Sequence, residues 1–356
     1  MSRDNLRNIL DLARWAPSGD NTQPWRFEIV DETLIRVYGH DTRDHVLYDF
    51  EGYPSHIAHG ALIETMRIAA TGFGMTTDWA VASSGDDRSP VYDITFKPSS
   101  GIAKDPMFSC IEKRAVQRRP MKTTALTDVQ RQGLIRAAGD GFSVQLFELM
   151  PHRLAIAKLL WQSAHVRLTC PEAYPVHRDI IEWNARYSKD RIPDQAVGVD
   201  PVTSRLMHWV LQSWERVDFF NKYLMGTVAP RIQLDWLPAL RCAAHLLVRP
   251  NRKPSQLRDW VELGAVVQRI WLTATLHGLH FQPQMTPVIF RWYARSGRSF
   301  SASPGLFEDA VKLSSNFERV TQSTPTDEFG FFARVGVCEP PRSRSIRQDV
   351  NDLMRA

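Results

Sequence analysis

Two clusters of basic residues are the parts of this sequence best suited to bind a charged ligand. One cluster runs from Lys113 to Arg119, and the other runs from Arg342 to Arg347. Arginine carries a planar guanidinium group that forms paired hydrogen bonds to phosphate. A single basic cluster is more often a solvated face, but two clusters in one chain also fit a buried phosphate pocket.

The spacing within each cluster allows its arginines to point the same way. Arg114 and Arg118 are four residues apart and could share one face of a short helix or turn. Arg342 and Arg344 would alternate to the same side of an extended segment. Each cluster could therefore present two guanidinium groups to one anion.

A polar loop near the N-terminus is the second group of residues that could do chemistry. Apolar residues recur at helical spacing over residues 5–16, and Pro17 ends that predicted helix. A strand is predicted over residues 25–30, with a hairpin partner at 34–38. The loop between helix and strand carries serine, aspartate, asparagine and glutamine. Taken alone, it could be only a helix-ending turn.

The ordered string of residues strongly resembles a known family. Residues 16–27, APSGDNTQPWRF, resemble the signature of nitroreductase-family flavoproteins, in which an Ala-Pro-Ser loop, an Asn and a Gln-Pro-Trp lead into a strand. Residues 113–120 look like the family's phosphate segment, and residues 336–344 are similar to its closing strand and basic tail. The resemblance covers most of the chain and is weakest between about 200 and 240.

The resemblance implies an FMN site and the residues that would form it. The phosphate would be held by Arg114, Arg118, Arg342 and Arg344, and the polar edge of the ring by Pro17, Ser18, Asn21 and Gln23. Gln282 and Pro283 stand where the family's loop passes the ring. Two residues depart from the family's pattern: Val116 replaces a common hydroxyl, and Asp20 places a carboxylate close to the ring. Such a carboxylate would oppose negative charge on a reduced flavin.

The sequences of two predicted helices can be aligned with each other. GALIETMRIAATGFGM, at residues 60–75, matches GAVVQRIWLTATLHGL, at residues 264–279, and pairs Gly60 with Gly264 and Glu64 with Gln268. Coincidence between two amphipathic helices is the alternative to duplication. A glycine at each helix start would allow close approach to another backbone or a ring. The order of segments resembles the tandem-duplicated Acg-like branch of the nitroreductase family.

We therefore predict an α+β protein of nitroreductase-like fold, with two fused degenerate copies that form a pseudo-dimer. The first half would span residues 1–100, and the second 101–356 with an insertion at about 200–240. The first half carries the Pro-Ser-Gly-Asp loop, which residues 137–141 lack in the second half. The second half opens with an arginine cluster that the first half lacks. One site at the junction is therefore expected.

Hydrophobic periodicity predicts the remaining elements. Helices are expected at residues 56–71, 126–138, 151–189 and 257–277, and strands at 76–97, 143–149, 241–248 and 332–337. The segment from Leu206 to Trp236 is rich in aromatic residues. It could be a lid over the flavin, a partner-binding helix or a helix packed on the core.

Other site classes find little support in the sequence. The four cysteines are far apart, which argues against a disulfide framework or a zinc site, and His277 and His280 lack partners for a metal. The start of the chain lacks the apolar stretch of a signal peptide, and no run reaches the roughly 20 apolar residues of a membrane span. A cytoplasmic protein with no nucleic-acid module is expected.

The leading functional hypothesis is that bound FMN carries hydride from NAD(P)H to a small acceptor, such as a nitroaromatic or a quinone. No acid–base side chain is assigned. A non-catalytic FMN-binding or sequestering protein with a lidded site is the first alternative. A flavin-dependent tailoring enzyme is the second, because the Acg-like branch includes parts of fusions with ThiF-like adenylating domains; an adenylating enzyme would be its partner. The chain could be a pseudo-dimeric monomer or a higher homo-oligomer.

Overall fold

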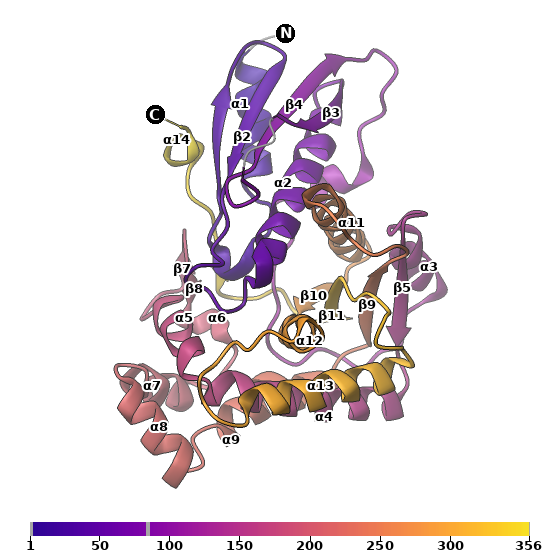
Figure 1. The fold of residues 1–356 in the computed structure, drawn as a ribbon. Helices are drawn as coiled ribbons and strands as arrows, with labels where there is room; N and C mark the ends of the chain where they lie inside the picture. Colours follow the sequence, from indigo (N-terminus) through magenta and orange to yellow (C-terminus); the bar gives the residue numbers. More distant parts are fainter. Residues whose placement is uncertain (1–2, 83–85, 356) are drawn as a thin grey trace.

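A computed structural model describes residues 3–82 and 86–355 and contains two four-stranded antiparallel sheets surrounded by helices (Figure 1). The predicted α+β class is confirmed. Residues 83–85, which fall in the range predicted for strands, lie outside the described residues. None of the helices in the described part of the chain is long and apolar enough to cross a membrane.

The first sheet packs one face on two helices. In chain order, its half contains α1 (Arg3–Ala13), η1 (Gly19–Asn21), β1 (Trp25–Ile29), β2 (Leu34–Gly39), η2 (Phe50–Gly52), α2 (Tyr53–Thr71), β3 (Met75–Val81), β4 (Val91–Pro98) and η3 (Pro106–Cys110). Burial alternates along β2 and β4, because one face of the sheet meets α1 and α2 and the other does not. The hydrophobic core of this half includes Leu6, Phe27 and Leu62.

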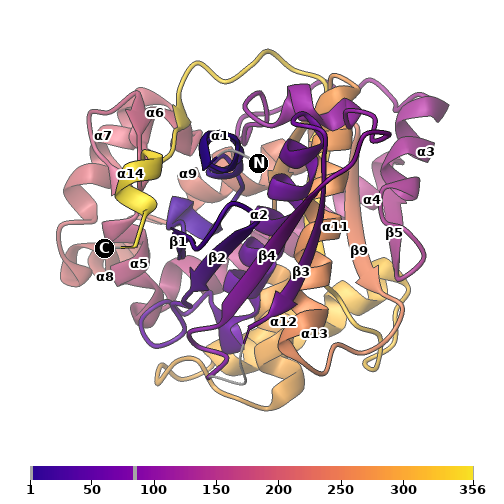
Figure 2. The same ribbon diagram turned by 90° about the horizontal axis from the view of Figure 1, so that it is seen from above.

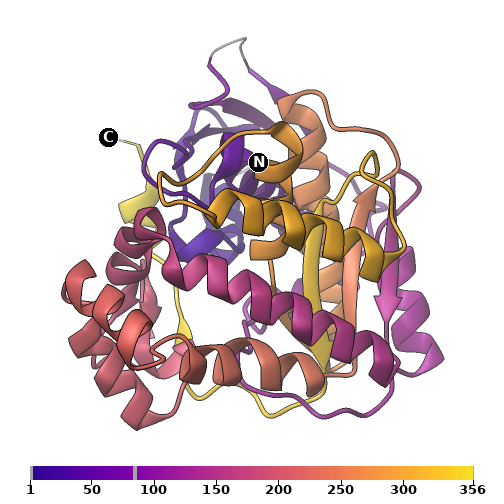
Figure 3. The same ribbon diagram turned by 60° about the horizontal axis from the view of Figure 1, so that its bottom comes forward.

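The second sheet is covered on both faces. Its framework is α3 (Asp128–Arg136), β5 (Phe142–Phe147), β9 (Ala244–Pro250), α11 (Leu257–Leu276), β10 (His280–Pro283), α12 (Thr286–Ser296), α13 (Leu306–Thr321) and β11 (Phe331–Gly336). All six residues of β11 are buried. This continuous burial follows because α11 lies on one side of the sheet, and α12, α13 and α4 (Met150–Thr169) lie on the other (Figures 1 and 3).

A long insertion separates β5 from β9. After α4 it contains η4 (Pro171–Ala173), α5 (Tyr174–Asp179), β6 (Ile181–Glu182), β7 (Tyr187–Ser188), β8 (Ile192–Pro193), α6 (Asp194–Val197), α7 (Pro201–Val210), α8 (Trp214–Tyr223), α9 (Val228–Pro230), the π-helix η5 (Arg231–Trp236) and α10 (Leu237–Leu240). The C-terminal tail contributes β12 (Arg344–Ser345), which pairs with β7, and α14 (Val350–Leu353). The prediction of helix over 151–189 is confirmed for α4 and α5 and wrong elsewhere: Pro171 prevents α4 from continuing, and two short strands, β6 and β7, follow α5.

The two sheets share one topology. The first has the strand order β1-β2-β4-β3, and the second has the order β5-β9-β11-β10 when read from β5. Numbered along the chain within each half, both orders are first-second-fourth-third. Each half also contains a helix, two strands, a long helix and two more strands. This agreement supports the predicted duplication, while the boundaries at 1–100 and 101–356 stay a prediction.

The long helices α2 and α11 lie side by side at the junction of the halves (Figures 1 and 2). A Cβ atom at Gly60 would lie 1.9 Å from the Val261 carbonyl oxygen, and one at Gly264 would lie 2.0 Å from the Ile57 carbonyl oxygen. The alignment that pairs Gly60 with Gly264 also pairs Ile57 with Val261. The contact is therefore reciprocal, as across a twofold axis.

Polar contacts between these helices repeat the same symmetry. Arg269 forms an ion pair with Glu64 at 2.5 Å, and Gln268 Nε2 donates to Thr65 Oγ1 at 2.9 Å. The helix alignment pairs Glu64 with Gln268 and Thr65 with Arg269, so one contact maps onto the other. The junction thus resembles the interface of a symmetric dimer.

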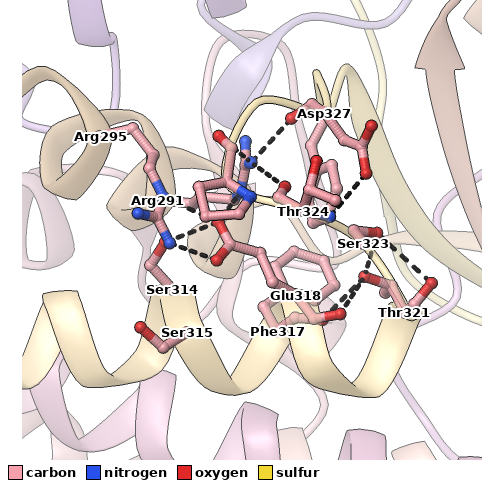
Figure 4. A network of polar contacts seen from close by, with 12 residues as sticks. Arg291, Arg295, Ser314, Ser315, Phe317, Glu318, Thr321, Ser323, Thr324 and Asp327 are labelled. Atoms are coloured by element: carbon pink, nitrogen blue, oxygen red, sulfur yellow. Dashed lines mark hydrogen bonds and ion pairs between the residues drawn. The ribbon is translucent and has the colours of Figure 1, made fainter.

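A buried ion pair fixes α12 on α13 (Figure 4). Arg291 Nε lies 2.9 Å from Glu318 Oε1, and Arg291 Nη2 also donates to the carbonyl oxygens of Thr324, Pro325 and Asp327. Arg295 Nε donates to the same Glu318 oxygen at 2.7 Å. Because α12 follows β10 directly, this network holds the end of β10 in place.

The glycine contacts predict a loss of stability on substitution. Gly60→Ala should lower the free energy of unfolding by about 2 kcal/mol or more, because the new methyl group forces the two helix backbones apart. Urea denaturation measures the change. Gly101→Ala is the control, because a Cβ there meets nothing within 4 Å. Equal stability of the two variants would contradict the close contact of the helices.

Candidate functional site

A cavity of about 520 Å³ lies between the halves of the chain. The first half contributes the loop at residues 17–21 and the residues Ile57, Ala58 and Ala61 of α2. The second half contributes Arg114, Ala115, Val116 and Arg118, together with parts of α11, β10, the insertion and the C-terminal tail. The cavity is therefore built from both halves.

Eight of the ten residues expected to hold FMN line this cavity: Pro17, Ser18, Asn21, Arg114, Arg118, Gln282, Pro283 and Arg344. Gln23 and Arg342 do not line it. The cavity wall also contains Arg347, which the sequence analysis named only as the end of a basic cluster.

Three arginines at one end of the cavity use backbone carbonyls as their partners. Arg114 is buried, and its Nη2 donates to Trp15 O at 2.7 Å. Arg344 Nη1 donates to Glu112 O at 2.9 Å, and Arg347 Nε donates to Ala16 O at 3.1 Å. The Arg114 guanidinium lies over the Trp271 ring, at 4.5 Å from its centroid. Within residues 3–82 and 86–355, none of the three arginines forms an ion pair with a carboxylate.

The lack of a counter-charge is costly at these arginines. Burial lowers the pKa of Arg114 well below its usual value, and the charges of Arg347 and Arg344 lower it further. Burial also lowers the pKa of Arg347 to about 9. Buried charges without a partner are unfavourable, so an anion bound among them would remove the repulsion. We call Arg114, Arg344 and Arg347 the arginine cluster; its chemistry suits a phosphate.

Arg118 lies outside the arginine cluster for a geometric reason. Val116 forms a β-bridge with Phe281, so the segment from 114 to 118 is extended and not helical. Four residues of extended chain span about 13 Å, which separates Arg118 from Arg114. Arg118 Nη1 donates to Ala196 O at 3.3 Å; burial lowers the pKa of Arg118, and the charge of Asp20 opposes that change.

The loop of the first half is locked to the C-terminal tail. Gln23 Nε2 donates to Asn21 O and Lys189 O, and Gln23 Oε1 accepts from Gln348 N at 2.9 Å. Asn21 Nδ2 donates to Ile346 O at 3.1 Å. Gln23 therefore holds the loop and the tail together from behind the cavity wall.

Two side chains on the wall carry buried acceptors without a partner among the residues described. Asn21 Oδ1 and Gln282 Oε1 receive no hydrogen bond. An unsatisfied buried acceptor costs free energy, so both atoms suit a ligand that presents N–H or O–H groups. They lie on the walls contributed by different halves of the chain.

A second polar group lies on the wall of the same cavity. Tyr48 Oη lies 2.8 Å from His177 Nε2, and Arg167 pairs with Asp235 at 3.1 Å. Asp20 and Arg118 also belong to it, because the charges of Arg118 and Arg167 both act on Asp20. We call Asp20, Tyr48, Arg118, Arg167, His177 and Asp235 the mixed-charge cluster. Tyr48, Arg167, His177 and Asp235 carried no motif in the sequence, so sequence reasoning missed them.

Burial controls protonation in the mixed-charge cluster. It raises the pKa of Asp235 to about 6, against the opposing charges of Arg167 and Arg231. It lowers the pKa of His177 to about 3, which keeps this imidazole neutral at pH 7. Burial also raises the pKa of Asp20 above its usual value, although Arg118 and Arg167 oppose the change.

The aromatic insertion covers one side of the cavity. Met207, Leu211, Trp214 and Leu234 line it, whereas Phe219 and Tyr223 are exposed on the outside of α8. Asn221 Nδ2 donates to Leu168 O at 2.9 Å, and Tyr174 Oη donates to Leu211 O at 2.9 Å. The insertion is thus fixed to α4 and α5, and it supplies an apolar wall.

The pKa of Asp235 predicts a pH-dependent stability. Between pH 3.8 and 6 the folded chain binds more protons at Asp235 than the unfolded chain, so the wild type loses stability as pH rises through this window. Asp235→Asn removes this loss, and its stability relative to the wild type should rise by on the order of 2 kcal/mol from pH 4 to pH 7. Urea denaturation at both pH values measures it, with the exposed Asp128→Asn as control. A difference that does not change with pH would contradict it.

Comparisons with known proteins find a family match for the first part of the chain. The model of the nitroreductase family matches residues 1–52. The putative NAD(P)H nitroreductase acg of Mycobacterium tuberculosis is 27% identical over 106 residues, which are 29% of this chain and 31% of that protein. The chain therefore matches about a third of the length of that curated relative.

Two of the solved structures with similarity to this chain are FMN-dependent nitroreductases. NfnB from Mycobacterium smegmatis in complex with NADPH has a TM-score of 0.38 and 12% identity, with 70% of this chain and 97% of that chain covered. NfnB from Sphigopyxis sp. strain HMH has a TM-score of 0.39 and 10% identity, with 70% and 98% covered. The resemblance to the nitroreductase family that the motif at residues 16–27 predicted is confirmed by the family match over residues 1–52.

Proposed function

We propose that this protein binds FMN in the cavity between its halves and transfers hydride from NAD(P)H through FMN to a small acceptor. One observation carries the proposal: three arginines without a carboxylate partner lie at one end of a cavity whose wall also holds unsatisfied acceptors. FMN combines a phosphate dianion with a ring that bears an N–H group. The residues present therefore fit the group at both of its polar parts.

The chain offers distinct contacts for the two ends of FMN. Arg114, Arg344 and Arg347 would hold the phosphate. Pro17, Ser18, Asn21, Gln282 and Pro283, the remaining wall residues expected from the family resemblance, would contact the ring. The charge of Asp20 acts on Arg118, whereas the charges that act on Arg114 are those of Arg347 and Arg344, so we assign Arg118 to the ring end and not to the phosphate.

FMN supplies the redox chemistry when bound, because its ring accepts and releases a hydride. The chain contributes the cavity, and the apolar wall supplied by Leu211, Trp214 and Leu234 shields one side of it from water. The relative from Mycobacterium tuberculosis is named a putative NAD(P)H nitroreductase, which supports NAD(P)H as the donor.

A second candidate is an FMN-binding protein that sequesters the cofactor and does not turn over. The fixed insertion favours it, because Leu211, Trp214 and Leu234 close one side of the cavity. The two candidates differ in one measurement: anaerobic NADPH bleaches the flavin absorbance of an oxidoreductase rapidly, whereas a sequestering protein stays yellow. A partnership with an adenylating enzyme stays a hypothesis from the family resemblance.

The first prediction of the proposal is a stoichiometry. Purified protein should be yellow, or become yellow on reconstitution, with about one FMN per chain, because all three residues of the arginine cluster line the same cavity. Flavin absorbance against protein concentration measures the ratio. Two FMN per chain would contradict a single junction site, and protein that cannot bind FMN would refute the proposal.

A pair of variants tests the assignment of the phosphate contacts. Arg347→Met should weaken FMN binding by about 10- to 100-fold, because hydrogen bonds between charged groups contribute about 1.5–3 kcal/mol. Arg342→Met is the matched control: it removes the same charge from the same tail, but Arg342 does not line the cavity. Fluorescence titration of FMN gives both affinities. Equal weakening by both variants would show a general effect of charge and contradict the assignment.

A further inference from the structure

Exposed apolar side chains gather on the outer face of the insertion. Seven of the nineteen large apolar side chains that are exposed in the described residues lie on α7, on α8 or directly after α8: Val202, Leu206, Trp209, Phe219, Tyr223, Leu224 and Met225. We call these seven residues the outer apolar patch. We propose that it binds the same patch on a second copy of this chain, so that two chains form a dimer with twofold symmetry. The inference goes beyond the proposed function and holds whether or not the cavity binds FMN.

The outer apolar patch is continuous across both helices. Its residues on α7 are spaced four and three positions apart, which places them on one face of the helix: Val202, Leu206 and Trp209. On α8, the Phe219 and Tyr223 rings contact each other with centroids 5.2 Å apart. Phe220 joins the two helices, because its ring lies 5.8 Å from that of Trp209 and 6.2 Å from that of Phe219.

The patch is separate from the cavity that the same helices help to form. Met207 and Trp214 of this segment line the cavity, whereas none of the seven patch residues does. α7 and α8 lie at the edge of the molecule, away from both four-stranded sheets (Figures 1 and 3). The cavity therefore explains the apolar residues on the inner face of the insertion, but it gives no structural reason for those on the outer face.

The area of the patch fits the interface of a stable dimer. Its exposed fractions, such as 72% for Tyr223 and 69% for Met225, correspond to roughly 600 Å² in total, with about 200 Å² for an aromatic and about 100 Å² for an aliphatic side chain. Each partner of a standard interface buries about 800 Å², and about 65% of a homodimer interface is apolar. The patch can therefore supply the apolar part of such an interface. Its composition also fits, because Trp, Tyr, Phe and Met are enriched at interfaces.

The charges on these helices favour a second copy over a lipid surface. α7 and α8 carry three basic residues, Arg205, Arg216 and Lys222, and two acidic residues, Glu215 and Asp218. Lys222 and Asp218 neutralise each other at 2.7 Å, so two arginines and one glutamate remain. Segments that bind anionic lipids carry clusters of about four to eight Lys or Arg residues. A border with charges of both signs suits its own copy, because a twofold axis can place a basic residue of one chain beside an acidic residue of the other.

Sedimentation equilibrium of the full-length chain tests the association. The wild type should reach twice its mass of 40.7 kDa, with a dissociation constant in the micromolar range or tighter, as interfaces of this size have. The double variant Phe219→Ser/Tyr223→Ser should weaken the dimer by at least about 30-fold, the effect of one interface residue that dominates binding. Both side chains are exposed, so the variant should keep the circular dichroism spectrum of the wild type.

Val129→Ser/Leu149→Ser is the matched control. It removes two apolar side chains that are each 64% exposed, and it should change the dissociation constant by less than about twofold. Val129 belongs to α3, which lies on the opposite side of the molecule from α7 and α8 (Figures 1 and 2). Leu149 lies between β5 and α4. A loss of association in both double variants would show a general effect of surface hydrophobicity and overturn the proposed interface.

Three other results would also overturn the proposal. The first is a wild type that stays monomeric well above micromolar concentrations. The second is a dimer that Phe219→Ser/Tyr223→Ser leaves intact, because the contact would then lie elsewhere. The third is a monomeric wild type that floats with phosphatidylglycerol vesicles, which would assign the patch to a lipid surface. FMN content measured on the same samples tests the proposed function separately, since a chain without FMN can still form this dimer.

Discussion

The close contact of α2 and α11 determines the rest of this structure. Gly60 and Gly264 let each helix backbone reach a carbonyl oxygen of the other, at a distance that a side chain would block. The two helices then bring Ala61 from one half and Trp271 from the other to the wall of one cavity. A larger separation of the helices would move the two walls of the cavity apart, and with them the unsatisfied acceptors of Asn21 and Gln282.

The arginine cluster shows how the chain keeps three positive charges close together. Each guanidinium is held by a backbone carbonyl: Trp15 for Arg114, Glu112 for Arg344 and Ala16 for Arg347. Carbonyl oxygens orient the groups without neutralising them, which a carboxylate would do. The cost appears in the lowered pKa of Arg114 and Arg347. An anionic ligand therefore gains from a site whose electrostatic strain the folded chain already carries.

Sequence patterns predicted the parts of the site that depend on local geometry. The loop at residues 17–21 and the paired glycine helices follow from short strings, and the loop and both helices contribute residues to the cavity wall. The directions in which Arg114 and Arg118 point were harder to predict, because spacing alone does not distinguish a helix from an extended chain. The bridge between Val116 and Phe281 extends the segment and separates Arg118 from Arg114. Tyr48 and His177 are separated by 129 positions, so no local pattern could have paired them.

The two halves contribute unlike segments to the cavity at their junction. The strand order and the glycine contacts are the same in both halves, so the framework allows a second, related site. That site would need a polar loop between α3 and β5, where the chain has only residues 137–141. The chain makes a tight turn within this segment at Gly139, which has a positive φ of 66°. The insertion between β5 and β9, in contrast, has no counterpart in the first half, and it covers one side of the cavity. The short segment at 137–141 and the insertion between β5 and β9 thus make the two halves unequal, and the cavity at their junction is lined by different residues on its two sides.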